Sequence, residues 1–171
     1  MFGFTRRTDY ALVALAGLAD EPSPDPKSAR SISERYGVPL PLLMNVLKDL
    51  VNGGIVSSTR GAKGGYSLAR APRGISVHDV VSAIEGPVSV TLCCDPAEAE
   101  PCQECSVEIH CPITHSVRRM NERIQDYLRE VTLEHLMNDK SDVFAPTSRL
   151  VPVTSLRARI PARVPGGKGD S

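Results

Sequence analysis

One short polar stretch of this 171-residue chain carries all five of its cysteines within nineteen residues. They are Cys93, Cys94, Cys102, Cys105 and Cys111. Thiolates are the ligands that select iron–sulfur clusters or zinc, and a loop can converge three of them where two helices could not. Spacing alone does not separate an iron–sulfur cluster from a structural zinc site. It does argue against inert cysteines, because a polar loop has no core for them to occupy.

Cys102 and Cys105 are separated by two residues, which is also the spacing of a redox-active thiol pair. A reactive thiol needs a cation or a helix N-terminus nearby, whereas residues 81–111 hold six Asp/Glu and no Lys or Arg. These carboxylates disfavour free thiolates electrostatically. The charge pattern therefore argues against a thiol oxidoreductase, and we expect no catalytic residues.

A histidine lies within reach of the cysteines. His115 follows Cys111 by four residues, which is about one turn into the helix predicted to come next. From that position its side chain can point back toward the cysteines and complete a ligand set. A solvated helix residue is the alternative, and the spacing leaves both open.

Upstream of the cysteines, two predicted helices are joined by a short turn that contains glycine. Ser28 can cap the first helix, and Gly37 ends it. The second helix begins near Pro39 and Pro41 and ends at Gly53, in keeping with the frequency of proline at helix starts. Its predicted buried stripe consists of Leu43, Val46, Leu47 and Leu50. This pattern is typical of a helix-turn-helix.

The opposite face of the second helix is predicted to meet double-stranded DNA. A helix in the major groove needs a few polar or small residues that reach base edges while its other face stays in the core. That face comprises Pro41, Met44, Asn45 and Lys48. Asn45 could read an adenine, and Lys48 could contact a phosphate. The alternative is that both are ordinary solvated helix residues.

Residues 55–59 and 66–69 are predicted to form two short β segments, separated by the turn RGAKGG. Its glycines allow a tight turn, and Arg60 and Lys63 project from its rim. Such a hairpin is a wing that places cations on the DNA backbone or in the minor groove. A plain hairpin connection is the alternative.

Two further helices are predicted in this half, over residues 8–19 and from Ser76 to Gly86. Beyond the cysteines, apolar residues recur at alternating spacings of four and three. They are Ile113, Val117, Met120, Ile124, Tyr127 and Val131. That spacing is the seam of a helix packed along another helix, and a chain of this size has little to cover it. We therefore predict a dimerisation helix, followed by a short turn that Thr132 caps.

The length leaves room for one domain with a real core plus appendages, and the predicted fold is mainly α with a small β wing. The predicted parts are a winged helix-turn-helix domain at 1–87, a cysteine loop at 88–111, a dimerisation helix with a short terminal helix at 112–138, and a disordered tail at 139–171. The N-terminus lacks the apolar run of a signal peptide, and no stretch approaches the length of a membrane span. We expect a cytoplasmic protein without a membrane partner.

Several stretches of the sequence together resemble the Rrf2 family of bacterial transcription regulators. They are TDYALVALAGLA, ISERYGVPLPLLMNVLKDLVNGGIVSSTRGAKGGYSL, ISVHDVVSAIEGPV followed by cysteines, and the final VTLEHL. The likeness covers about residues 1–137 and leaves the tail outside. It implies a homodimer with a winged helix at each end, crossed dimerisation helices and an iron–sulfur cluster. Members of this family control iron–sulfur cluster assembly or sense nitric oxide.

The resemblance also implies a set of cluster ligands. The three cysteines that match the family pattern are Cys93, Cys105 and Cys111. This sequence has an insertion between the first two, so Cys102 could replace Cys105 or complete the set. The fourth ligand differs among relatives, and the matching residues here are His115 and Asp9, the latter from the partner subunit. For Asp9, a helix-start carboxylate stabilised by the helix dipole is the alternative.

The preferred hypothesis is a repressor or dual regulator that binds DNA as a homodimer and senses an iron–sulfur cluster of two or four irons, an oxidant or nitric oxide. Its targets would be genes of cluster assembly or stress response. A zinc-stabilised dimeric regulator, or an interaction module without a redox cluster, is the alternative. Cluster occupancy must shift the balance between DNA-competent and incompetent dimers, because otherwise it regulates nothing.

Overall fold

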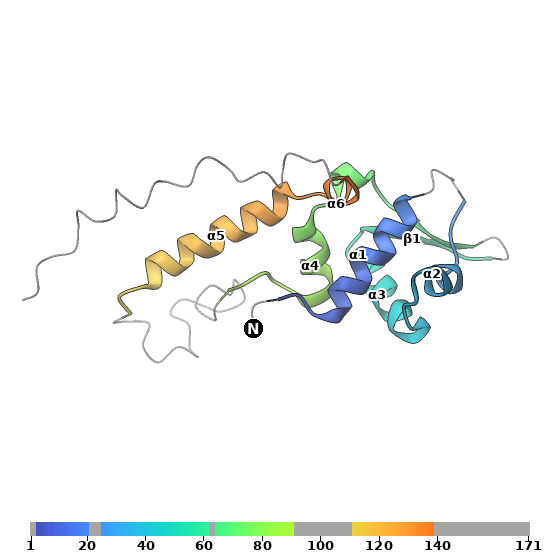
Figure 1. Cartoon of the computed structure of the whole chain (residues 1–171), viewed down its shortest axis with the longest axis horizontal. Helices are drawn as coiled ribbons and strands as arrows, with labels where there is room; N and C mark the ends of the chain where they lie inside the picture. Colours follow the sequence, from blue (N-terminus) through green and yellow to red (C-terminus); the bar gives the residue numbers. More distant parts are fainter. Residues whose placement is uncertain (1–2, 21–24, 62–63, 91–110, 139–171) are drawn as a thin grey trace, which may run out of the picture.

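The computed structural model describes residues 3–20, 25–61, 64–90 and 111–138, shown in colour in Figure 1. The order of elements is α1 (Arg6–Ala19), α2 (Ala29–Tyr36), α3 (Leu40–Asn52), β1 (Val56–Thr59), β2 (Gly65–Leu68), a 3-10 turn η1 (Pro72–Gly74), α4 (Val77–Glu85), α5 (Thr114–Glu130) and α6 (Leu133–Met137). The mainly helical fold with a two-stranded wing is as predicted.

The core of the molecule lies among α1, α2, α3 and α4. All four residues of the predicted stripe on α3 are buried. They pack with apolar side chains of the other helices and of β1, including Leu15, Ile32, Val56 and Val80. Burial of these side chains is the main source of stability for this part of the fold.

The ends of α2, α3 and α4 follow the capping residues predicted from the sequence. The Ser28 hydroxyl accepts a hydrogen bond from the Ser31 N–H at 3.1 Å, and Gly37 closes α2 in the left-handed conformation with φ 67°. At α4, Ser76 and Asp79 form a reciprocal capping box. Such caps satisfy the free N–H groups of the first turn.

The wing is an antiparallel pair in which Val56 faces Leu68 and Thr59 faces Gly65. A short third segment joins it, because Lys27 and Tyr66 exchange backbone hydrogen bonds of 2.8 and 2.9 Å. A Cβ at Gly65 would lie 2.6 Å from the Lys27 carbonyl oxygen, so glycine is required for this close approach. The sequence pattern did not predict this third segment.

The first helix begins earlier than the predicted range of residues 8–19, and a residue distant in the sequence holds its first turn. α1 starts at Arg6, and its N-cap residue Thr5 makes no side-chain capping bond. Instead, the Glu85 carboxylate at the end of α4 accepts hydrogen bonds from the Thr5 N–H at 2.9 Å, the Thr5 hydroxyl at 3.0 Å and the Thr8 hydroxyl. A carboxylate is favourable at a helix N-terminus, where the dipole is positive. Glu85 thus fixes the start of α1 to the end of α4.

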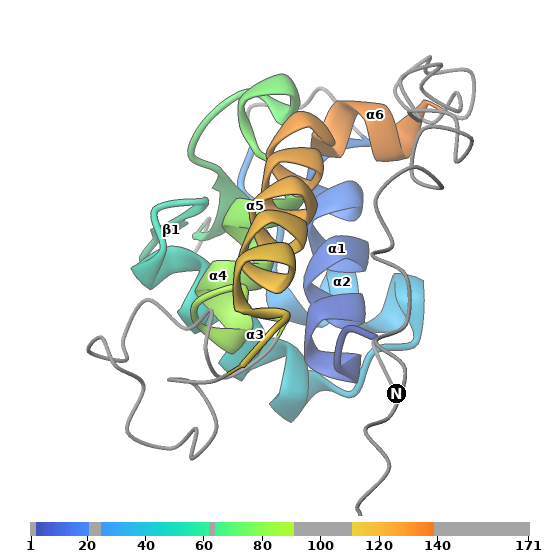
Figure 2. The same ribbon diagram turned by 90° about the vertical axis from the view of Figure 1, so that its left-hand side faces the viewer.

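The long helix α5 extends away from the four-helix body and contacts it mainly through α4 (Figures 1 and 2). Beyond α5 the chain returns to the body. The Val77 N–H donates to the Val131 carbonyl and the Leu133 N–H donates to the Ile75 carbonyl, both at 2.8 Å. Thr132 caps α6 as predicted. Among the described residues, no helix has the length and apolar character needed to span a membrane.

Candidate nucleic-acid interface

The exposed face of α3 carries the four residues predicted to meet DNA. Pro41, Met44, Asn45 and Lys48 are all exposed. They lie opposite the buried stripe, so the core holds one side of α3 while the other side faces solvent. This is the arrangement that a helix needs in order to enter a major groove.

Several contacts fix the position of α3 relative to its neighbours. At the turn between α2 and α3, the Ser33 hydroxyl donates to the Val38 carbonyl at 2.7 Å, and the Val38 side chain is buried. Near the other end of the helix, Arg7 of α1 donates to the Asp49 carboxylate at 2.5 Å. The exposed face of α3 is therefore presented by a helix held at both ends.

The wing brings one of its two predicted cations into the described structure. Arg60 follows β1 directly and is exposed, whereas Lys63 lies outside the described residues. The base of the wing is fixed to α1, because the Lys27 ammonium donates to the Gly17 carbonyl at 2.6 Å. Arg60 is thus carried on a hairpin whose base is attached to the helical body.

Leu42 is an exposed residue of α3 that the sequence reasoning did not select. Its side chain is 46% exposed, close to the 47% of Met44. A signal was present, since Leu42 lies about 90° around the helix from the centre of the buried stripe, at its edge. An apolar residue off the stripe of an amphipathic helix is a candidate for contact with something outside the fold.

Both ends of the cysteine segment lie against α5. The Asn121 side-chain oxygen accepts from the Val90 N–H at 3.0 Å, and the Gln125 side chain donates to the Val88 carbonyl at 2.7 Å. At the other end, the Thr114 hydroxyl in the first turn of α5 donates to the Cys111 carbonyl at 3.4 Å. The described residues that flank 91–110 on both sides are therefore held by the same helix.

The predicted ligands fall only partly within the described structure. Cys93, Cys102 and Cys105 lie outside it. Cys111 is half-buried beside the start of α5, and His115 is exposed in the first turn of that helix. Asp9 is exposed in the first turn of α1. Within the described ranges, no three of these residue types come together as a metal site.

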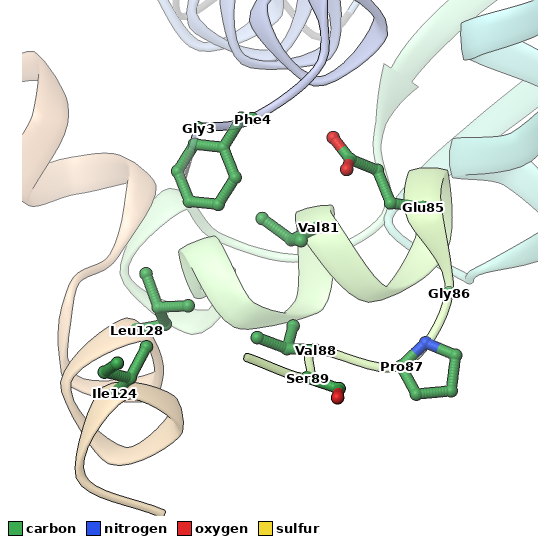
Figure 3. A pocket seen from close by; sticks show the side chains of 10 residues that line it. All are labelled: Gly3, Phe4, Val81, Glu85, Gly86, Pro87, Val88, Ser89, Ile124 and Leu128. Atoms are coloured by element: carbon green, nitrogen blue, oxygen red, sulfur yellow. The ribbon is translucent and has the colours of Figure 1, made fainter. Parts of the chain in front are cut away.

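A groove of about 430 Å³ lies between the N-terminal segment, α4 and α5. Phe4 and Glu85 border it on one side, while Ile124 and Leu128 approach from α5 (Figure 3). The segment that continues into the cysteines also borders the groove, through Val88. The residues that lead into the cysteine segment thus lie close to both the N-terminal segment and α5.

Two ionisable side chains of α4, Glu85 and His78, have pKa values that are shifted by their surroundings. Burial tends to raise the pKa of Glu85, but hydrogen bonds from Thr8 and Thr5 and the positive charge of Arg7 outweigh it, so the pKa is lowered. At the contact of α4 with α5, burial and the charge of Arg129 lower the pKa of His78, against an opposing effect of Asp79. Glu85 therefore remains a carboxylate, and its hydrogen bonds to α1 persist at neutral pH.

The apolar seam predicted on α5 is divided between two environments. Ile113, Met120 and Tyr127 recur every seven residues and are 57%, 45% and 48% exposed. Val131, the last residue of the predicted seam, is instead buried. It packs against Val77 and Val81 of α4. One flank of the seam thus packs on the body of the same chain, and the other flank is open.

The sequence matches a known family over most of its length. The family is Rrf2, described as an iron-dependent transcriptional regulator, and the match covers residues 4–139. An rrf2-like HTH-type transcriptional regulator from Rhodobacter capsulatus is 41% identical over 112 residues, which are 64% of this chain and 75% of that protein. The HTH-type transcriptional regulator IscR of Pectobacterium carotovorum is 33% identical over 137 residues, which are 80% of this chain and 79% of that protein.

Solved structures agree with the sequence comparison. CymR, the global cysteine regulator of B. subtilis, superposes with a TM-score of 0.62 at 26% identity, covering 82% of this chain and 100% of CymR. IscR of T. potens gives a TM-score of 0.60 at 28% identity, covering 85% of this chain and 93% of that one. These proteins are transcription regulators rather than enzymes. The chain therefore belongs to the Rrf2 family of DNA-binding transcription regulators, with the winged-helix fold of that family.

Proposed function

We propose that this protein is a homodimeric, cytoplasmic repressor that binds operator DNA and senses iron–sulfur cluster, redox or nitric-oxide status through its cysteine segment. Its targets would be genes of cluster assembly or stress response. The observation that carries the proposal is the attachment of both ends of residues 91–110 to α5, at Val88, Val90 and Cys111. A change in that segment would therefore act directly on the helix that joins two subunits.

DNA binding is assigned to α3 and the wing. Asn45 would read an adenine edge in the major groove, and Pro41 and Met44 would lie against the bases beside it. Lys48, Arg60 and Lys63 would neutralise phosphates, which supplies much of the affinity of such proteins for DNA. The exposure of the first five of these residues supports the assignment.

Dimerisation is assigned to the open flank of α5. Three large apolar side chains at seven-residue spacing are exposed there, which suits knobs-into-holes packing against the same helix of a second copy. Covering them would remove apolar surface from water, the usual source of dimer stability. A two-fold dimer would present two copies of α3 to two half-sites of an operator.

The donor set of the cysteine segment suits an iron–sulfur cluster. Cys93, Cys105 and Cys111 would supply three thiolates, and Cys102, His115 or Asp9 a further ligand. Cys111 and His115 lie one turn apart at the start of α5, and the Cys111 backbone is fixed by Thr114. When bound, a cluster of two or four irons would supply a centre that oxidants, nitric oxide or iron shortage can alter.

The chain offers a route from the cysteine segment to the DNA-reading helix. Glu85 lies close to the start of that segment and holds the first turn of α1. In the same turn, Arg7 holds Asp49 of α3. A displacement of residues 88–90 would thus be transmitted to α5 through Asn121 and Gln125. It would be transmitted to α3 through Glu85 and Arg7. Regulation requires that the two states of the segment differ in their affinity for DNA.

The proposal is tested on protein purified without oxygen. We expect a brown dimer that contains iron and sulfide, and an operator affinity that changes when the cluster is removed by a chelator. Cys111→Ala should abolish the colour, whereas Cys94→Ala, next to Cys93 but outside the proposed ligand set, should retain it. Colourless protein with stoichiometric zinc, or equal operator affinity with and without the cluster, would overturn the sensing role.

DNA binding itself is tested separately by a mobility-shift assay. Asn45→Ala and Arg60→Ala should each weaken binding to the operator, and Arg60→Ala should also reduce its salt dependence. Glu134→Ala, an exposed residue of α6, is the control and should bind normally. If neither α3 nor wing substitution changes binding, the assignment of the DNA face is wrong.

A further inference from the structure

We infer that Leu42 and Met44 read the methyl groups of thymines, and so determine the specificity of this regulator for its operator. The inference deepens the proposed function, because it rests on α3 entering the major groove. It concerns a different question, namely which bases the helix selects. Three independent features support it: the exposure of the two side chains, their placement on the helix and their chemistry.

Leu42 and Met44 are exposed, and neither side chain is part of the apolar core. α3 buries four apolar side chains on one face, and the core of the body is complete without Leu42 and Met44. Both are nearly half exposed, at 46% and 47%. The other large exposed apolar side chains of the described structure lie on α1 and α5, in α6 and in the N-terminal segment. Leu42 and Met44 are therefore set apart on the proposed DNA-reading helix.

The placement of the two residues matches the part of a reading helix that touches bases. Recognition helices contact base edges with their N-terminal residues, and Leu42 and Met44 lie in the first two turns of α3. At about 100° per residue, Pro41 and Asn45 share one row along the helix, with Leu42 on one side of it and Met44 on the other. A base pair read by Asn45 would thus have apolar side chains on both flanks.

The chemistry of the major groove leaves one specific partner for an apolar side chain. Base edges there present hydrogen-bond donors and acceptors, and the thymine C5-methyl is the apolar group among them. A cytosine amino group or a guanine oxygen against Leu42 would lose its water without gaining a partner, which is unfavourable. Asn45 favours adenine, whose partner base is thymine. The three side chains together favour an A·T-rich half-site.

The inference is tested with the full-length dimer and duplexes in which deoxyuridine replaces thymine. A duplex is first selected from a random-sequence pool by the wild-type protein, and each thymine of a half-site is then replaced singly. This exchange removes one methyl group and leaves every hydrogen bond of the base pair. From the free energy gained by burying one methyl group, we expect the affinity for the duplex to fall about fourfold at two or more positions.

Variants assign each methyl to its side chain. At one of these positions, Leu42→Ala should reduce the loss of affinity caused by the thymine-to-uracil exchange to less than twofold. Met44→Ala should do so at another position. Val13→Ala is the matched control, because it truncates an exposed apolar side chain on α1 and should leave every penalty unchanged. Alanine is favourable in helices and the two α3 residues are exposed, so the variants should fold.

Two outcomes would overturn the inference and are distinguishable. If every uracil duplex binds like its thymine parent, or Leu42→Ala and Met44→Ala leave all penalties unchanged, the inference fails while preference for the selected duplex stands. If the wild-type protein shows no preference for any selected duplex over random competitor, the proposed DNA-binding function fails, and the inference fails with it.

Discussion

The four-helix body and α5 differ in how much of themselves they bury. In thirteen residues, α3 buries four apolar side chains, whereas α5 buries only Asn121 in seventeen. The body has a continuous apolar core, while α5 is attached by a few apolar contacts and by polar side chains that hold backbone groups. The body thus contains the buried apolar core of the described residues, whereas the outer side of α5 carries exposed apolar side chains that the proposed dimer would cover.

The largest effect should follow truncation inside the body. Leu47→Ala removes a side chain that is completely buried at the centre of α3. A cavity of this kind costs about 2 to 5 kcal/mol, a large part of the stability of a small domain. Denaturant unfolding should show the loss. Leu42→Ala on the exposed side of the same helix is the control and should change stability by far less. Equal losses of stability in the two variants would show that the core does not depend on the buried side of α3 more than on its exposed side.

The next effect should appear in assembly rather than in folding. Met120→Glu combined with Tyr127→Glu places two charges on the open flank of α5. A dimer dissociation constant raised at least about tenfold is expected, because buried unpaired charge is costly. Sedimentation measures it, and circular dichroism should show an intact fold. Arg119→Glu, exposed on α5 but off the apolar flank, should remain dimeric. A double variant that stays dimeric would exclude this flank as the interface.

A smaller effect should come from the polar attachment of α5. Asn121→Ala leaves the half-buried Val90 N–H without its acceptor, and loss of such a hydrogen bond costs about 0.5 to 1.5 kcal/mol. Hydrogen exchange should show faster exchange at Val90, with little change at the centre of α3. Asp126→Ala, an exposed residue of α5, is the control. Unchanged exchange at Val90 would show that Asn121 does not hold the start of the cysteine segment.

The smallest effect should come from the junction of α1 with α4. Glu85→Ala removes the acceptor for Thr5 and Thr8, at a cost of about 1 kcal/mol, as for other helix-cap losses.

The hydrogen bonds between Glu85 and the first turn of α1 also predict that the stability of the protein depends on pH. The lowered pKa of Glu85 means that its stabilising contribution is present above its ordinary value of 4.5 and is lost as the pH falls through the folded-state value. The difference in stability between wild type and Glu85→Ala should therefore shrink in acid. A difference that is constant from neutral pH to pH 3 would exclude the carboxylate as its source.

Much of the fold could be predicted from local patterns. Ser28, Gly37 and Ser76 act at helix ends through contacts with near neighbours in the chain, so their residue types sufficed. The buried stripe of α3 followed from helical spacing. The exposed residues Pro41, Met44, Asn45 and Lys48 of the candidate DNA face followed from the same spacing, because the side of α3 opposite its stripe must face solvent.

Contacts between distant residues could not be predicted in this way. Glu85 holds Thr5 across eighty positions, and Lys27 pairs with Tyr66, and no periodicity links either pair. The seam on α5 was predicted as one surface, but Val131 turns into the body because the chain after α5 pairs with residues 75–77. Pairing that is set by tertiary structure leaves no signal in one sequence.

The attachment of residues 90 and 111 to a single helix also bears on how the intervening stretch can vary. Because both anchor points are fixed by α5, added length between Cys93 and Cys105 alters neither of them. Doubling a flexible connection costs only about 0.6 kcal/mol of closure entropy. Variants with a longer or shorter stretch between residues 90 and 111 should therefore keep both anchor points on α5.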